Sequence, residues 1–147
     1  MVLLHIMCSL LSYAAFLVAC GAGVLFLIQE RQLKRKTIGR LCHQLPALGV
    51  SERITTMAMG AGVGLLSVGT VCGFVGTGTF FGQWWTGDPK EYLTLVLWLS
   101  SLGLLGWRFR AGLRGRRVAF LAILGFALVL VTSVGLRHLV VSMHPYV

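Results

Sequence analysis

Long apolar stretches alternate with shorter, mostly basic segments along the chain. An α-helix needs about 20 mainly apolar residues to cross the hydrocarbon core of a membrane. Four stretches fit or approach this length, at about residues 3–28, 54–75, 92–107 and 118–141. The pattern therefore predicts an all-α integral membrane protein, in which residues 1–147 form a single bundle of four transmembrane helices.

Basic residues are concentrated in two of the segments that connect the predicted helices. The connection after the first helix contains Arg31, Lys34, Arg35, Lys36, Arg40 and Arg53, and the connection after the third contains Arg108, Arg110, Arg114, Arg116 and Arg117. Loops rich in Lys and Arg stay on the cytoplasmic side. We therefore expect both termini and the loop over residues 76–91 to lie on the outer, periplasmic face of a bacterial inner membrane.

The composition agrees with this placement. The chain is 56% hydrophobic and only 12% charged, whereas soluble domains are about 25% charged. The net charge of +9 is shared with some nucleic-acid-binding proteins, but a soluble protein of that kind would need far more than 12% charged residues, so we expect no nucleic acid as partner. Anionic membrane lipid is the expected partner of the basic loops.

Glycine is frequent within the predicted helices, with 19 in the chain. Gly60 and Gly64 form a GxxxG pair in the second helix, which predicts close packing of this helix against another. The four cysteines form no CxxC motif. This argues against a thiol-exchange enzyme and favours small buried side chains.

Aromatic residues gather in the predicted outer loop, where Trp84 and Trp85 are adjacent. An isolated Trp is typical of the membrane–water interface, but this pair is followed by a well-defined helix start. Asp88 suits the N-cap, Pro89 the first helical position and Glu91 the third. The loop is therefore expected to form a rigid apolar platform just before the third helix.

Two histidines at opposite ends of the chain reach the same face in the predicted topology. His5 lies near the outer end of the first helix, and His144 lies just past the outer end of the fourth. Each alone fits a polar residue at the interface, but together with a Trp-rich loop they suit haem, whose iron accepts axial imidazoles. Arg137, beside His138, fits a haem propionate, although both residues also fit side chains that reach toward the interface.

The loop resembles the Trp-rich WWD motif of the CcsA/ResC haem-handling proteins of cytochrome c biogenesis, which are related to CcmC, CcmF and HemX. The motif reads approximately Trp-Gly-x-x-Trp-x-Trp-Asp-Pro-Lys-Glu. The matching residues are Gly82, Trp85, Asp88, Pro89, Lys90 and Glu91. Further segments resemble the family in the same order: His5 with Ser12-Tyr13-Ala14, Phe26 to Lys34, and Met143-His144-Pro145-Tyr146.

The resemblance implies a b-type haem held at the outer face, with His5 and His144 as axial ligands of the iron. It further implies that the Trp-rich loop covers the porphyrin. The expected cofactor-binding residues are His5, His144, Trp84, Trp85, Asp88, Lys90 and Arg137. In the family the haem is presented to the Cys-x-x-Cys-His segment of an apocytochrome c, and no catalytic residue of the membrane protein is required.

Two residues depart from the family pattern. Gly87 replaces the Trp that precedes the Asp of the motif, and Gly106 stands where the family has a His near the inner end of the following helix. The chain resembles the C-terminal core of CcsA-type proteins, which carry further helices before it. We therefore expect other membrane subunits as partners.

These departures leave three interpretations. The first is a CcsA-like haem-handling protein of c-type cytochrome assembly. The second is a non-catalytic structural subunit of a larger membrane redox complex. The third is a HemX-like regulator of haem synthesis.

Overall fold

The computed structural model describes residues 2–35, 47–82, 87 and 89–143, with the side chains of residues 2, 80, 81, 89, 90 and 136–143 left aside. In these ranges the chain forms four helices: α1 (Val2–Lys34), α3 (Leu48–Phe81), α4 (Pro89–Arg110) and α5 (Arg116–Met143). Each is long and apolar enough to cross a membrane. The predicted all-helical, multi-pass membrane bundle is thereby confirmed.

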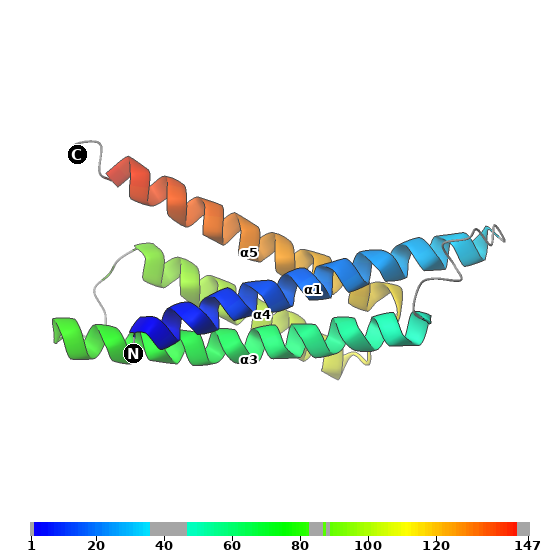
Figure 1. Ribbon diagram of the computed structural model, residues 1–147, viewed down its shortest axis with the longest axis horizontal. Coiled ribbons are helices and arrows are strands. Elements are labelled where there is room, and N and C mark those ends of the chain that lie inside the picture. The colour runs from blue at the N-terminus through cyan, green and yellow to red at the C-terminus, as the bar shows by residue number, and fades with distance from the viewer. Residues whose placement is uncertain (1, 36–46, 83–86, 88, 144–147) are drawn as a thin grey trace.

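Consecutive helices run in opposite directions (Figure 1). α1 packs most extensively against α3 and also contacts α5, while α3 contacts α4 as well. The start of α1, the end of α3, the start of α4 and the end of α5 therefore lie at one end of the bundle, which we call the His5 end. The end of α1, the start of α3, the end of α4 and the start of α5 lie at the opposite end, which we call the basic end. Toward the His5 end, α5 diverges from the other helices.

Helix α3 continues well past the apolar run that predicted it, and the expected loop over residues 76–91 is correspondingly shorter. The Gly- and Thr-rich segment before Phe81 is helical. Within it the Thr77 hydroxyl donates a 3.0 Å hydrogen bond to the Gly73 carbonyl one turn earlier, so the helix itself satisfies this polar side chain. The helix ends at Gly82, whose φ of 66° is the left-handed conformation typical of a C-terminal cap.

The centre of the bundle is organised around Phe16 of α1, which is 1% exposed. Its ring packs with Val63, Leu97 and Val129 from the other three helices. A Cβ atom at Gly62 would lie 3.1 Å from this ring, so α3 approaches α1 closely only because this position lacks a side chain.

The glycines that face α1 differ from the GxxxG pair that the sequence suggested. A Cβ atom at Gly60 or Gly64 would meet no atom within 4 Å, whereas Cβ atoms at Gly62, Gly69 and Gly73 would each meet a side chain of α1. The spacing of Gly60 and Gly64 places them on one face of α3, but α1 packs against a different face of that helix.

At the basic end, Arg108 ties the turn between α4 and α5 to α3. Its Nε and Nη2 atoms donate hydrogen bonds of 3.1 Å and 2.7 Å to the Thr56 hydroxyl, and Nη1 donates to the Leu113 carbonyl. The Glu52 carboxylate lies 3.8 Å from Nη2. The guanidinium is thus well satisfied although its side chain is only 14% exposed.

Candidate functional site around His5

His5 lies near the start of α1 and turns its imidazole toward α3. Its Nδ1 atom is 2.6 Å from the carbonyl oxygen of Gly69. A carbonyl oxygen only accepts hydrogen bonds, so Nδ1 is the donor here, and in the neutral imidazole this tautomer leaves the lone pair on Nε2. Metal-ligating histidines have this arrangement, in which one ring nitrogen donates to a backbone carbonyl and the other binds the metal.

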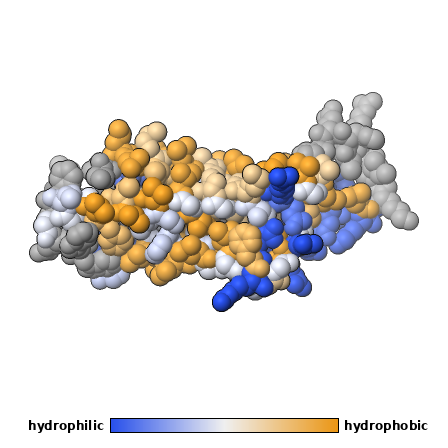
Figure 2. Space-filling view, turned by 90° about the horizontal axis from the view of Figure 1, so that it is seen from below, coloured by the Kyte–Doolittle hydropathy of each residue, from blue (hydrophilic) through white to orange (hydrophobic). Residues whose placement is uncertain are grey.

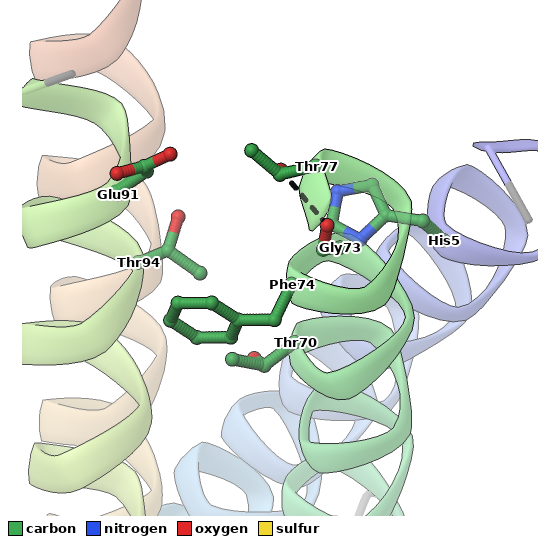
Figure 3. A pocket seen from close by; sticks show the side chains of 7 residues that line it. All are labelled: His5, Thr70, Gly73, Phe74, Thr77, Glu91 and Thr94. Atoms are coloured by element: carbon green, nitrogen blue, oxygen red, sulfur yellow. Dashed lines mark hydrogen bonds between the residues drawn. The ribbon is translucent and has the colours of Figure 1, made fainter. Parts of the chain in front are cut away.

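The imidazole fits against α3 because position 73 is a glycine (Figure 3). A Cβ atom at Gly73 would lie 3.1 Å from Nδ1 and 3.2 Å from Cε1 of His5. Gly69 supplies the carbonyl and Gly73, one turn later, supplies the space. These two glycines orient His5, and sequence reasoning missed both of them.

A cavity of about 170 Å³ opens between α1, α3 and α4 at this position. It is lined by His5, Thr70, Gly73, Phe74, Thr77, Glu91 and Thr94, and Figure 3 shows the α3 and α4 side chains facing one another across it. Pockets that enclose drug-sized ligands have volumes of roughly 300 Å³ or more. The part of this cavity that the described residues enclose is therefore smaller than a whole macrocycle, and a large flat ligand at His5 would extend beyond it.

The start of α4 forms one wall of the cavity. The helix begins at Pro89, as the sequence predicted, and the Glu91 carboxylate accepts a 3.2 Å hydrogen bond from the backbone N–H of Gly87. Gly87 has a φ of 74°, a left-handed conformation in which a Trp would be strained. Gly87 therefore suits a loop conformation that disfavours the Trp of the family motif.

The other predicted site residues are described less fully. Trp84, Trp85, Asp88 and His144 lie outside the described residues. Lys90 and Arg137 belong to described helices, near the start of α4 and toward the end of α5, although their side chains are not described. Their helix positions place these two residues toward the His5 end of the bundle.

His5 is the one histidine whose side chain belongs to the described part of the chain. Among the described residues, no group of three or more His, Cys, Asp or Glu side chains is arranged to hold a metal ion. A site built from His, Asp and Glu ligands alone is thus not formed by this part of the chain. The imidazole of His5, with Nδ1 held by the Gly69 carbonyl, has the chemistry of a side chain that could ligate a metal through its other nitrogen.

The fold and this histidine define a class: a multi-pass helical membrane protein with an oriented imidazole at one end of the bundle. The chain matches the family described as Cytochrome C assembly protein over residues 1–144. It therefore belongs to the cytochrome c assembly protein family.

Curated relatives carry the name cytochrome c biogenesis protein CcsA. The protein of Synechococcus sp. (strain RCC307) is 31% identical over 164 residues, which cover 97% of this chain and 53% of that protein. The protein of Prochlorococcus marinus (strain NATL1A) is 36% identical over 95 residues, which cover 65% of this chain and 30% of that protein. The chain thus spans about half the length of the first of these and matches less of the second. No solved structure matches it.

Proposed function

We propose that the chain binds haem at the His5 end and acts in the assembly of c-type cytochromes. The observation that carries this proposal is the 2.6 Å hydrogen bond between His5 Nδ1 and the Gly69 carbonyl. It holds the imidazole in the tautomer and orientation that iron ligation requires. Membership of the cytochrome c assembly protein family supports the same conclusion.

In this proposal His5 and His144 would hold the haem iron. Trp84 and Trp85 cover the porphyrin face, and Asp88 fixes the loop that carries them. Aromatic side chains suit this role because they exclude water from a flat apolar ligand. Bound haem supplies the vinyl groups that become attached to an apocytochrome c.

The basic residues nearest to this end, Lys90 and Arg137, are proposed to neutralise the haem propionates. Carboxylates form strong charge-assisted hydrogen bonds with such side chains. The chain's own contribution is then to orient the haem, to exclude water and to hold the iron, without an acid–base residue. Positioning of this kind accounts for a large part of many catalytic effects.

An absorption spectrum of the purified protein tests the proposal. In detergent with added haem, the wild-type chain should give the low-spin spectrum of iron with two histidine ligands. His5→Ala and His144→Ala should each remove it, whereas the control His43→Ala, in the basic connection between α1 and α3, should retain it. Wild-type protein that takes up no haem would refute the proposal.

The proposed topology places the His5 end at the periplasmic face of a bacterial inner membrane, since the basic connections belong to the cytoplasm. Two threonines offer a matched test in a cysteine-free background. A membrane-impermeant maleimide should label Thr86→Cys in spheroplasts, and Thr37→Cys only after lysis. The reverse pattern would invert the topology.

A second candidate function is that of a non-catalytic structural subunit in a membrane redox complex. Gly87 favours it, because the residue replaces a Trp of the haem-covering motif and has a left-handed backbone. This function predicts haem-free protein that co-purifies with cytochrome-complex subunits in a fixed ratio. The haem spectrum therefore separates the two candidates.

A further inference from the structure

A second concave surface lies at the basic end of the bundle, between the last turns of α4 and the first turns of α5. It has a volume of about 460 Å³. Its lining includes the apolar side chains of Trp107, Leu113, Phe120 and Leu124, together with one charged side chain, that of Arg117. The site around His5 does not use any of these residues.

The lining changes from charged to apolar along the helix axis. Arg117 lies in the first turns of α5, and Leu124 follows seven residues later, about 10 Å deeper into the bundle. Trp107 is 59% exposed, and Phe120 and Leu124 are each 49% exposed. In a membrane-spanning bundle such exposed apolar side chains face acyl chains, while the arginine stands at the level of the headgroups.

Positive charge surrounds the charged end of this groove. Exposed arginines occur at four positions of the turn and its flanks: Arg110, Arg114, Arg116 and Arg117. None of them forms an ion pair with a described acidic residue. The Arg116 guanidinium also lies 5.4 Å from the centroid of the Phe120 ring, which keeps this charge at the rim. Figure 2 shows hydrophilic residues gathered at this end, directly beside apolar surface.

We propose that this groove binds one anionic phospholipid, with its phosphate against Arg117 and its acyl chain along Phe120 and Leu124. The surplus of arginines supplies the complementary charge for an anionic headgroup, and the apolar length of the groove suits the upper part of an acyl chain. A zwitterionic lipid would lack the net charge that these arginines attract.

Trp107 provides a probe inside the groove. The protein is reconstituted into phosphatidylcholine vesicles that contain an equal fraction of acyl-brominated phosphatidylglycerol or acyl-brominated phosphatidylcholine. The fluorescence of Trp107 is obtained as the difference in emission between the wild type and Trp107→Phe. We expect brominated phosphatidylglycerol to quench this signal at a several-fold lower fraction than brominated phosphatidylcholine.

Two variants that each remove one positive charge distinguish lipid binding in the groove from general attraction to the protein surface. Arg117→Gln should reduce the preference for the anionic lipid about fivefold, the effect expected for one basic residue near the membrane surface. Arg53→Gln removes an exposed arginine from α3 at the same end of the bundle, and it should leave the preference unchanged. Arg117→Lys keeps the charge and should retain the preference.

Three results would overturn the proposal. Equal quenching by the two brominated lipids would show that the groove does not select charge. Equal losses in Arg53→Gln and Arg117→Gln would show attraction to the surface as a whole. Absence of quenching by either lipid would show that protein, and not lipid, covers the groove.

Discussion

Substitution of Gly73 by alanine tests whether α3 orients the proposed haem ligand. The new Cβ atom would lie 3.1 Å from Nδ1 and 3.2 Å from Cε1 of His5, whereas ordinary van der Waals contacts begin near 3.4 Å. The imidazole must therefore move by a few tenths of an ångström. This movement strains the 2.6 Å hydrogen bond to the Gly69 carbonyl, while both helices remain intact.

The expected effect is on haem affinity and not on folding. Loss of a group that orients a metal-ligating histidine lowers metal affinity roughly 10- to 100-fold, so Gly73→Ala should weaken haem binding about tenfold. Alanine also favours the helix over glycine by about 1 kcal/mol. The variant should therefore unfold no more readily than the wild type.

Gly64→Ala is the matched control, because a Cβ atom there would meet no atom within 4 Å. Haem affinity is measured by titration of the detergent-solubilised protein and followed in the Soret band, with circular dichroism as a check on folding. Gly64→Ala should bind haem within about twofold of the wild type. Equal affinities of the two variants would refute the reasoning about His5.

Three further predictions concern stability, measured by reversible unfolding in mixed detergent micelles. Phe16→Ala should lower the free energy of unfolding by about 3 kcal/mol through loss of a buried ring. Phe109, which is 67% exposed, is the control, and an equal loss in Phe109→Ala would contradict the proposed core. Arg108→Ala should lower the free energy of unfolding by about 2 kcal/mol, because it removes several charge-assisted hydrogen bonds. The exposed control Arg110→Ala should lower it by less than about 0.5 kcal/mol. A larger loss in Arg110→Ala than in Arg108→Ala would contradict the hydrogen bonds described for Arg108. Glu91→Gln should cost about 0.5 kcal/mol by removing a negative charge from the first turn of α4, and stabilisation would contradict its role there.

The sequence predicted the four helices because each apolar run is long enough to span a membrane. It underestimated their lengths, since the Gly- and Thr-rich segment before Phe81 has a loop-like composition. The Thr77 hydroxyl is satisfied within the helix by the Gly73 carbonyl, and composition alone does not reveal such bonds. Likewise, α1 continues to Lys34, where a 2.7 Å ion pair with Glu30 supports its last turn.

The candidate site was predictable only in part. A histidine near a helix end, combined with a Trp-rich loop and family motifs, led to the choice of His5 from the sequence, and its role as an iron ligand stays a prediction. The Gly69 carbonyl that orients the ring could not be predicted from the sequence, because every residue type has a backbone carbonyl. Gly73 belongs to the small-residue pattern of the helix, but only the position of α1 distinguishes it from Gly64, where a Cβ atom would meet no atom within 4 Å. The pairing of His5 with His144 stays a prediction.

The most direct test of the account is chemical rescue of the proposed iron ligand. In His5→Gly the helix remains while the imidazole is removed, and the haem-loaded protein should lose the low-spin spectrum of the wild type. Added imidazole should restore that spectrum by occupying the vacated position. A His5→Gly protein that keeps the wild-type spectrum without imidazole would contradict the claim that His5 holds the haem iron.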